Sequence, residues 1–152
     1  ALFDRDGTVN VDTGHLHELE ECELIDSTTD LMRGYAQNPA WRIAVVTNQA
    51  GIAKGMYSTG DMRTLHRAMA ERLLTRGARV DAWYFCPHHP DFTGTCDCRK
   101  PKPGMLLRAL RDFRADASES VMYGDKSSDE KAATAAGVAF RRVGRDTEWK
   151  TA

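Results

Sequence analysis

The sequence has almost no net charge and contains no long apolar run. Its 21 Lys and Arg residues balance 22 Asp and Glu residues, so the formal net charge is -1. That balance excludes a global basic field able to hold a polyanion such as DNA. Apolar runs such as residues 43–46 are far shorter than the roughly 20 residues that span a bilayer. We also see no secretory leader, so we expect a cytoplasmic protein that binds neither membranes nor nucleic acid.

Internal repeats, low-complexity tracts and linkers are also missing. A chain of 152 residues with 41% hydrophobic composition can bury one substantial core and has no room for a second. We therefore expect one domain over residues 1–152, acting as a monomer. The chain opens on the end of an expected strand, residues 1–4.

Cysteine is scarce, and its placement is informative. Two disulfides would be the simple interpretation in a secreted protein, but three of the four cysteines share a short segment with two histidines, a pattern typical of an intracellular metal site. Three thiolates and one imidazole make a closed tetrahedral Zn2+ set with no open position for catalysis. His89 is the alternative imidazole, and Cys22 stands apart as a free thiol. We expect structural Zn2+ bound by Cys86, His88, Cys96 and Cys98, in a loop over residues 86–98.

Short β-branched or aromatic runs alternate with helical periodicity along the chain. This alternation predicts an α/β three-layer sandwich with a mostly parallel sheet, in which ligands bind beyond the carboxyl ends of the strands. Ser58 and Asp61 form a capping-box pattern at the start of one helix, and Gly137 ends another. The expected strands are 1–4, 41–47, 82–86, 121–124 and 139–143, and the expected helices are 59–76, 104–114 and 129–136.

Polar residues follow several of the expected strands. Asp4 and Asp6 lie two residues apart, so on an extended segment their side chains share a face, and Gly7 then allows a turn. Two carboxylates in different environments can divide nucleophilic and acid/base roles. Taken alone, this short motif is as easily a polar turn.

Residues from three other segments strengthen the interpretation. Thr47 ends the next strand and can donate to a phosphoryl oxygen, while Lys100 can neutralise one. Asp125 then completes an oxygen-rich Mg2+ site. Lys102 lies close enough to compete with Lys100, and Asp129 has three open roles: orienting Lys126, joining the metal shell or capping its helix.

Four ordered motifs carry a resemblance to a known family: Phe3-Asp4-Arg5-Asp6-Gly7-Thr8, Val46-Thr47-Asn48-Gln49, Arg99-Lys100-Pro101 and Gly124-Asp125-Lys126-Ser127-Ser128-Asp129. The sequence resembles the haloacid dehalogenase (HAD) superfamily of phosphohydrolases. The resemblance implies a HAD-like Rossmannoid fold in which Asp4 forms an aspartyl-phosphate and Asp6 serves as acid, then base. It further implies Mg2+ held by Asp4, Asp125 and the backbone carbonyl of Asp6, with Thr47 and Lys100 stabilising the transferring phosphoryl group.

Within this superfamily the short connections and the zinc loop resemble the group of heptose-bisphosphate phosphatases and histidinol-phosphatases, which lack a large cap domain. The resemblance implies removal of the 7-phosphate from D-glycero-D-manno-heptose 1,7-bisphosphate, a phosphorylated sugar. His15 stands where the family usually has Tyr, and Ala50 where it usually has Ser. A histidinol-phosphate phosphatase and a catalytically silent zinc-stabilised binding module are the alternatives. The implied substrate contacts, besides the catalytic residues, are Asp12, Thr13, Gly14, His15, Asn48, Gln49, Ala50, Arg99 and Lys126.

Overall fold

The computed structural model describes residues 1–144 and contains a single five-stranded sheet in the order β3-β2-β1-β4-β5. All neighbouring strands pair in parallel. The central strand β1 is short, and Leu2 lies opposite Ala44 on one side and Met122 on the other. The strands are β1 (Leu2–Phe3), β2 (Ala44–Asn48), β3 (Ala82–Cys86), β4 (Val121–Gly124) and β5 (Ala139–Arg142).

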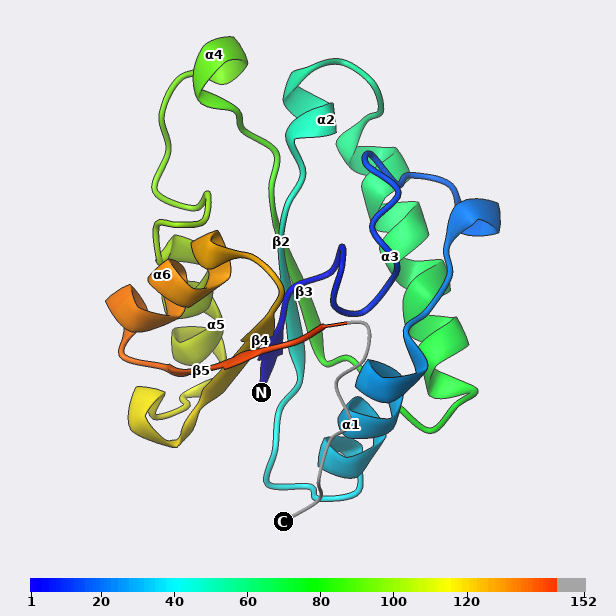
Figure 1. Cartoon of the computed structure of the whole chain (residues 1–152), viewed down its shortest axis with the longest axis vertical. Helices are drawn as coiled ribbons and strands as arrows, with labels where there is room; N and C mark the ends of the chain where they lie inside the picture. The colour runs from blue at the N-terminus through cyan, green and yellow to red at the C-terminus, as the bar shows by residue number, and fades with distance from the viewer. Residues whose placement is uncertain (145–152) are drawn as a thin grey trace.

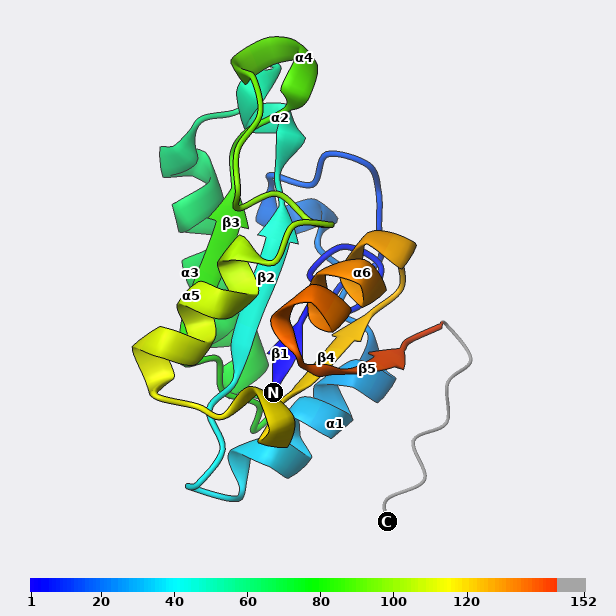
Figure 2. The same ribbon diagram turned by 90° about the vertical axis from the view of Figure 1, so that its left-hand side faces the viewer.

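Helices cover both faces of this sheet, as Figures 1 and 2 show. Side chains alternate across the strands, so Phe3 joins the core under α1 and α3, and Leu2 joins the core under α5 and α6. The predicted α/β three-layer sandwich is therefore confirmed. The helices are α1 (Asp26–Ala36), α2 (Ala50–Ala53), α3 (Thr59–Leu74), α4 (Pro90–Thr93), α5 (Gly104–Phe113) and α6 (Ser127–Ala136), with 3-10 turns η1 (Leu19–Glu21) and η2 (Ala117–Glu119).

Local signals in the sequence predicted two helix ends correctly. The Ser58 hydroxyl accepts from the Asp61 backbone N–H at 3.1 Å, and Asp61 Oδ2 accepts from the Ser58 N–H at 2.8 Å. Gly137 ends α6 with a φ of 72°, a left-handed conformation that glycine adopts without strain.

Other boundaries depend on contacts distant in sequence. The strand expected from residue 41 begins at Ala44, because the Ile43 N–H donates to the Asp81 carboxylate at 2.7 Å instead of joining a ladder. Helix α6 begins at Ser127, two residues before the expected start, since Asp129 Oδ2 accepts from the Lys126 N–H at 3.0 Å. Helix α1 was not predicted: its buried side includes Thr28 and Thr29, which hide the apolar periodicity.

The carboxyl ends of the strands carry only small connections. Residues 49–58 contain the short helix α2, and residues 87–103 contain the short helix α4, both at the top of Figure 1. No large insertion therefore covers this edge of the sheet within residues 1–144.

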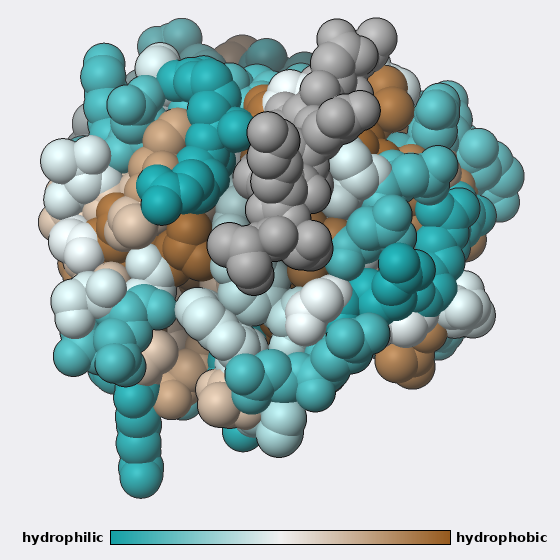
Figure 3. Space-filling model, turned by 60° about the horizontal axis from the view of Figure 1, so that its bottom comes forward, coloured by the Kyte–Doolittle hydropathy of each residue, from teal (hydrophilic) through white to brown (hydrophobic). Residues whose placement is uncertain are grey.

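At the other end of the molecule, Figure 3 shows hydrophilic side chains with small apolar patches between them. Among the described residues, no helix is both long and apolar enough to cross a membrane.

Candidate active site

Asp4 directly follows β1 and is buried against Lys100. The Lys100 ammonium lies 2.6 Å from Asp4 Oδ1 and 2.6 Å from Asp129 Oδ1, and it donates to the Val46 carbonyl at 2.8 Å. Burial raises the pKa of the Asp4 carboxyl, and Asp129 adds to this effect while Lys100 opposes it. Burial works against the Lys100 charge, but Asp4 and Asp129 outweigh it and raise the lysine pKa. Lys100 therefore stays cationic beside Asp4.

A third carboxylate completes this cluster. Oxygens of Asp4, Asp125 and Asp129 lie within 4.8 Å of one another. Asp125 Oδ1 is buried and has no hydrogen-bond partner among residues 1–144. Burial, then the charge of Asp4, raises the pKa of Asp125 to about 6. Convergent carboxylate oxygens, one of them unpartnered, fit a hard divalent cation such as Mg2+.

Asp129, the third carboxylate of this cluster, also makes an ion pair and a hydrogen bond that caps a helix. Oδ1 pairs with Lys100, and Oδ2 accepts from the Lys126 backbone N–H at the start of α6. Of the three roles considered for Asp129, the helix cap is therefore observed, together with an ion pair to Lys100 that sequence reasoning missed. Lys102, the rival of Lys100, instead pairs with Asp97 at the surface, 3.2 Å away.

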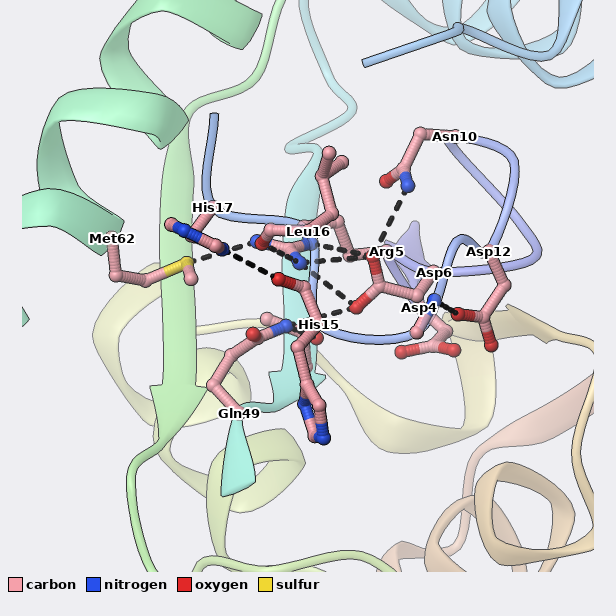
Figure 4. Close-up of polar contacts among 12 residues, drawn as sticks. Asp4, Arg5, Asp6, Asn10, Asp12, His15, Leu16, His17, Gln49 and Met62 are labelled. Atoms are coloured by element: carbon pink, nitrogen blue, oxygen red, sulfur yellow. Dashed lines mark hydrogen bonds and ion pairs between the residues drawn. The ribbon is translucent and has the colours of Figure 1, made fainter. Parts of the chain in front are cut away.

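Asp6 lies outside the carboxylate cluster. Strand β1 ends at Phe3 and a turn begins at Arg5, so the extended segment assumed for a shared face does not reach Asp6. Gly7, in the same turn, has a φ of 87° and packs directly against the Asp125 carboxylate. Figure 4 shows the Asp6 carboxylate facing Arg5, with Asn10 and Gln49 donating to it at 3.1 Å and 2.9 Å.

The residues after β2 are held by protein contacts. Gln49 Nε2 donates to Thr47 Oγ1 at 2.8 Å, which leaves the buried Thr47 hydroxyl its own proton to donate. The Tyr57 hydroxyl donates to Gln49 Oε1 at 2.7 Å. Asn48 exchanges two hydrogen bonds with the Lys100 backbone, at 2.9 Å and 3.0 Å. The amide groups of Asn48 and Gln49, expected to contact substrate, are thus engaged with neighbouring residues.

The Cys/His segment converges as expected. The sulfurs of Cys86 and Cys98 lie 3.1 Å apart, and Cys96 lies 3.5 Å from Cys98 and 3.6 Å from Cys86. His88 Nδ1 lies 3.4 Å from the Cys98 sulfur, and the four ligand atoms are all within 4.8 Å of one another. Zn–S bonds of about 2.3 Å imply sulfur–sulfur distances of about 3.8 Å in a tetrahedral site. The three sulfur–sulfur distances observed are shorter than this value, so the cluster is slightly more compact than an ideal zinc site.

The two alternatives for this segment are also decided by geometry. All four cysteines lie in the described residues and are free thiols, so no disulfide forms among them. His89 is not part of this group of convergent ligand atoms, and its Nδ1 accepts from the Asp91 N–H at 3.3 Å, at the start of α4. Arg99 donates to the His88 carbonyl at 3.2 Å, so the segment is joined directly to the residue before Lys100.

Comparisons with known proteins identify the family. A HAD-hydrolase-like family model matches residues 97–148. The chain is 45% identical over 144 residues to the D-glycero-beta-D-manno-heptose-1,7-bisphosphate 7-phosphatases of Yersinia pestis and Escherichia coli K12, covering 91% of this chain and 76% and 75% of theirs. The chain belongs to the HAD-like phosphatases. The predicted family resemblance is thereby confirmed.

Solved structures agree with this membership. The D,D-heptose 1,7-bisphosphate phosphatase of B. bronchiseptica, crystallised with magnesium and phosphate, matches this HAD-like phosphatase with a TM-score of 0.83 at 34% identity, over 91% of this chain and 76% of that one. A HAD-like phosphatase from Mesorhizobium loti gives a TM-score of 0.85 at 33% identity, over 91% and 68% of the two chains.

The expected substrate loop of this HAD-like phosphatase is connected to the start of α6. Asp12 Oδ1 accepts from the Gly14 N–H at 2.9 Å, and Asp12 Oδ2 pairs with Lys126 Nζ at 3.0 Å. Burial opposes ionisation of Asp12, but the Gly14 N–H and Lys126 lower its pKa overall. The His17 ring stacks on Tyr57 with centroids 5.0 Å apart. Asp12 is thus paired with Lys126. Thr13 and His15 lie in the same loop, and Ala50 is the first residue of α2.

Two site residues were missed by sequence reasoning, Arg5 and Tyr57. Arg5 is completely buried, and Tyr57 is 7% exposed. Arg5 lies between Asp4 and Asp6 in the nucleophile motif, and this position could have indicated a role in the site. Arginine is, however, mostly exposed in proteins, so a charged residue next to a strand end is ordinarily expected to be solvated. Tyr57 lies two residues after Gly55 in a loop, and nothing in the local sequence links it to Gln49.

Proposed function

We propose that this HAD-like phosphatase hydrolyses a phosphate monoester through an aspartyl-phosphate on Asp4. The observation that carries the proposal is the buried group of Asp4, Lys100 and Asp125, in which a cation and an unpartnered carboxylate oxygen flank one candidate nucleophile. Mg2+, when bound by Asp4, Asp125 and the backbone carbonyl of Asp6, supplies the charge that draws a phosphate dianion to these carboxylates.

The residues divide the reaction between them. Asp4 Oδ1 accepts from Lys100, so Oδ2 attacks phosphorus, and the bond from phosphorus to the ester oxygen breaks. The leaving oxygen takes its proton from Asp6, which must therefore be protonated in the complex with substrate, whereas in the free protein its two oxygens accept from Arg5, Asn10 and Gln49. Asp6, now a carboxylate, takes a proton from the water that attacks the phosphorus of the aspartyl-phosphate, which releases inorganic phosphate and regenerates Asp4. Thr47 and Lys100 donate to the phosphoryl oxygens in both steps.

We infer that the substrate is D-glycero-D-manno-heptose 1,7-bisphosphate and that its 7-phosphate is removed. The support is the 45% identity to enzymes named for this reaction. A second phosphate group also suits the cations beside the site: Arg99 borders the zinc loop, and Lys126 needs only to exchange its Asp12 partner for a phosphate oxygen. Asp12 and Gly14 shape the loop that faces the sugar.

We also propose that Cys86, His88, Cys96 and Cys98 bind Zn2+ in a structural role. The support is the convergence of three sulfurs and one imidazole nitrogen without an open position. Bound zinc would fix the segment that leads into Arg99 and Lys100.

Kinetics with Mg2+ test the substrate assignment. We expect kcat/KM for the heptose bisphosphate to exceed that for histidinol phosphate by on the order of 10²-fold, because a hydrogen-bonding site rejects a substrate that leaves its polar groups unpaired. The reverse preference would assign the chain to the histidinol-phosphate reaction. An Asp4→Asn variant that keeps its fold and zinc but loses hydrolysis supports the nucleophile. Unchanged activity in that variant would contradict it.

A further inference from the structure

Arg5 is the largest completely buried side chain of the described residues. A buried guanidinium is costly unless its N–H groups are all engaged. Nε and Nη2 donate to the two Asp6 carboxylate oxygens at 3.0 Å each, and Nη2 also donates to the Leu16 carbonyl at 3.0 Å. Nη1 lies 2.9 Å from Met62 Sδ and 3.3 Å from His66 Nε2. Figure 4 shows Arg5 between Asp6, Leu16 and Met62.

We propose that Arg5 is a positioning residue, which holds the Asp6 carboxylate in place for proton transfer and joins it to the substrate loop through the Leu16 carbonyl. The inference rests on the acid and base role proposed for Asp6. Arg5 is not itself a catalytic residue, because its contacts are to protein groups on every side.

The orientation of Asp6 depends on this arginine more than on any other neighbour. The planar fork of a guanidinium matches both carboxylate oxygens and so restrains rotation of the carboxylate. Asn10 and Gln49 each add a single hydrogen bond, one per oxygen. A lysine at this position would keep the charge, but its point-like ammonium lacks the fork and cannot restrain the carboxylate plane.

The same nitrogen links the acid/base residue to the loop over the substrate. Arg5 Nη2 contacts both Asp6 Oδ2 and the Leu16 carbonyl, and Leu16 is completely buried between the expected contacts at residues 12–15 and His17. A second connection runs from His17 through its stack on Tyr57 to Gln49 and then to Asp6. A shift of this loop on substrate binding therefore reaches Asp6 through two sets of contacts.

Helix α3 supports the far side of the arginine. Met62 and His66 both lie on its buried face. Because the Arg5 N–H groups only donate, His66 Nε2 must accept and the ring is neutral. His66 in turn stacks on Trp83, with ring centroids 4.4 Å apart. The guanidinium is thus fixed between Asp6 and a rigid layer of the core.

Leaving-group dependence separates positioning of a general acid from a purely structural role. An alkyl phosphate such as glycerol phosphate needs its leaving oxygen protonated, whereas p-nitrophenolate leaves without a proton. We expect Arg5→Lys to lower kcat/KM for glycerol phosphate about 10²-fold, the lower end of the range for general acid catalysis, and kcat/KM for p-nitrophenyl phosphate less than about 3-fold. Arg76→Lys is the matched control, because Arg76 is an exposed arginine paired with Asp26; both values should be unchanged.

A double variant tests whether Arg5 acts through Asp6. Asp6→Asn should show the same selective loss, and Arg5→Lys should add no further loss on glycerol phosphate in the Asp6→Asn background. Additive losses, or equal losses on both substrates, would overturn the proposal.

Two controls keep the outcome unambiguous. If Arg5→Lys unfolds, as judged by circular dichroism, Met62→Leu is the substitute variant, because it removes the sulfur contact of the arginine at nearly constant volume. It should lower kcat/KM for glycerol phosphate selectively, but by a smaller factor than Arg5→Lys. An equal loss on both substrates in this variant would also overturn the proposal. Wild-type protein that hydrolyses neither of these esters nor the heptose bisphosphate with Mg2+ would instead contradict the proposed phosphatase activity itself, and the role of Arg5 with it.

Discussion

Lys100 reaches 96 residues back along the chain to place its Nζ 2.6 Å from Asp4 Oδ1, and the same nitrogen lies 2.6 Å from Asp129 Oδ1. All three side chains are nearly inaccessible to solvent. Lys100 also donates to the Val46 carbonyl of β2, so one lysine joins the end of β1, strand β2 and the first turn of α6 at a single buried point. The carboxylates keep Lys100 charged, and Lys100 offsets part of their mutual repulsion.

Removal of the Lys100 charge is expected to reduce both stability and activity. In Lys100→Met the two carboxylates would lie buried without their cation, at a cost of about 3–5 kcal/mol in unfolding free energy. Urea denaturation of the metal-free protein measures this cost. Lys102→Met is the control, because Lys102 pairs with Asp97 at the surface and should change stability by less than about 1 kcal/mol. Similar losses in the two variants would contradict the assignment.

Gly7 is expected to tolerate no side chain. Its φ of 87° disfavours any other residue, and a Cβ there would collide with the Asp125 carboxylate. Gly7→Ala should therefore raise the Mg2+ concentration needed for half-maximal hydrolysis by on the order of 10-fold or more, as a displaced ligand would. Gly34→Ala is the control in an exposed turn of α1, where nothing lies within 4 Å of the added Cβ; we expect unchanged Mg2+ dependence and about 0.5–1 kcal/mol of added stability.

The two adjacent histidines are expected to differ in their effect on zinc. His88→Ala removes one of four convergent ligand atoms, so the purified protein should contain less zinc and lose thermal stability. His89→Ala removes only a hydrogen bond at the start of the short helix α4 and should keep one zinc per chain. Metal content by elemental analysis, with melting temperatures before and after chelation, distinguishes the two. Full zinc in His88→Ala would refute the ligand assignment.

Stability is expected to fall in mild acid because His66 resists protonation. Burial, and then the charge of Arg5, lowers the pKa of His66 to about 3, whereas an unfolded histidine titrates near 6.5. Between these values the unfolded chain binds the extra proton, so the free energy of unfolding decreases as pH falls below about 6.5 and is unaffected above it. The loss approaches about 1.4 kcal/mol per pH unit.

A His66→Gln variant isolates this contribution. Glutamine keeps an acceptor for Arg5 but does not titrate, so its unfolding free energy should decline less than that of the wild type between pH 7.5 and 5.5, by about 1.4 kcal/mol. Urea denaturation at several pH values measures the difference. His89→Gln, at a less buried ring, should follow the wild type. Parallel curves for wild type and His66→Gln would show that His66 is protonated in the folded protein.

The sequence by itself determined the order of the five strands and of helices α3, α5 and α6, and it predicted the positions that we propose for the chemistry. Strand periodicity and the carboxyl-end rule of parallel sheets located Asp4, Thr47 and Asp125. Short-range spacing alone predicted the ligand cluster between Cys86 and Cys98. The cap formed by Ser58 and Asp61 likewise depends on residues three apart. Each of these features is local, or follows from the general architecture of a parallel sheet.

Only the tertiary structure decided which side chains meet within that framework. It paired Lys100, not Lys102, with Asp4, turned His88 and not His89 toward the sulfurs, and buried Arg5 against Asp6 and α3. These outcomes join residues distant in sequence or choose between neighbours of the same chemistry. Burial and the packing of neighbouring elements decide them, because a charged side chain is stable inside a protein only where several partners converge on it, and that convergence is set by the whole fold.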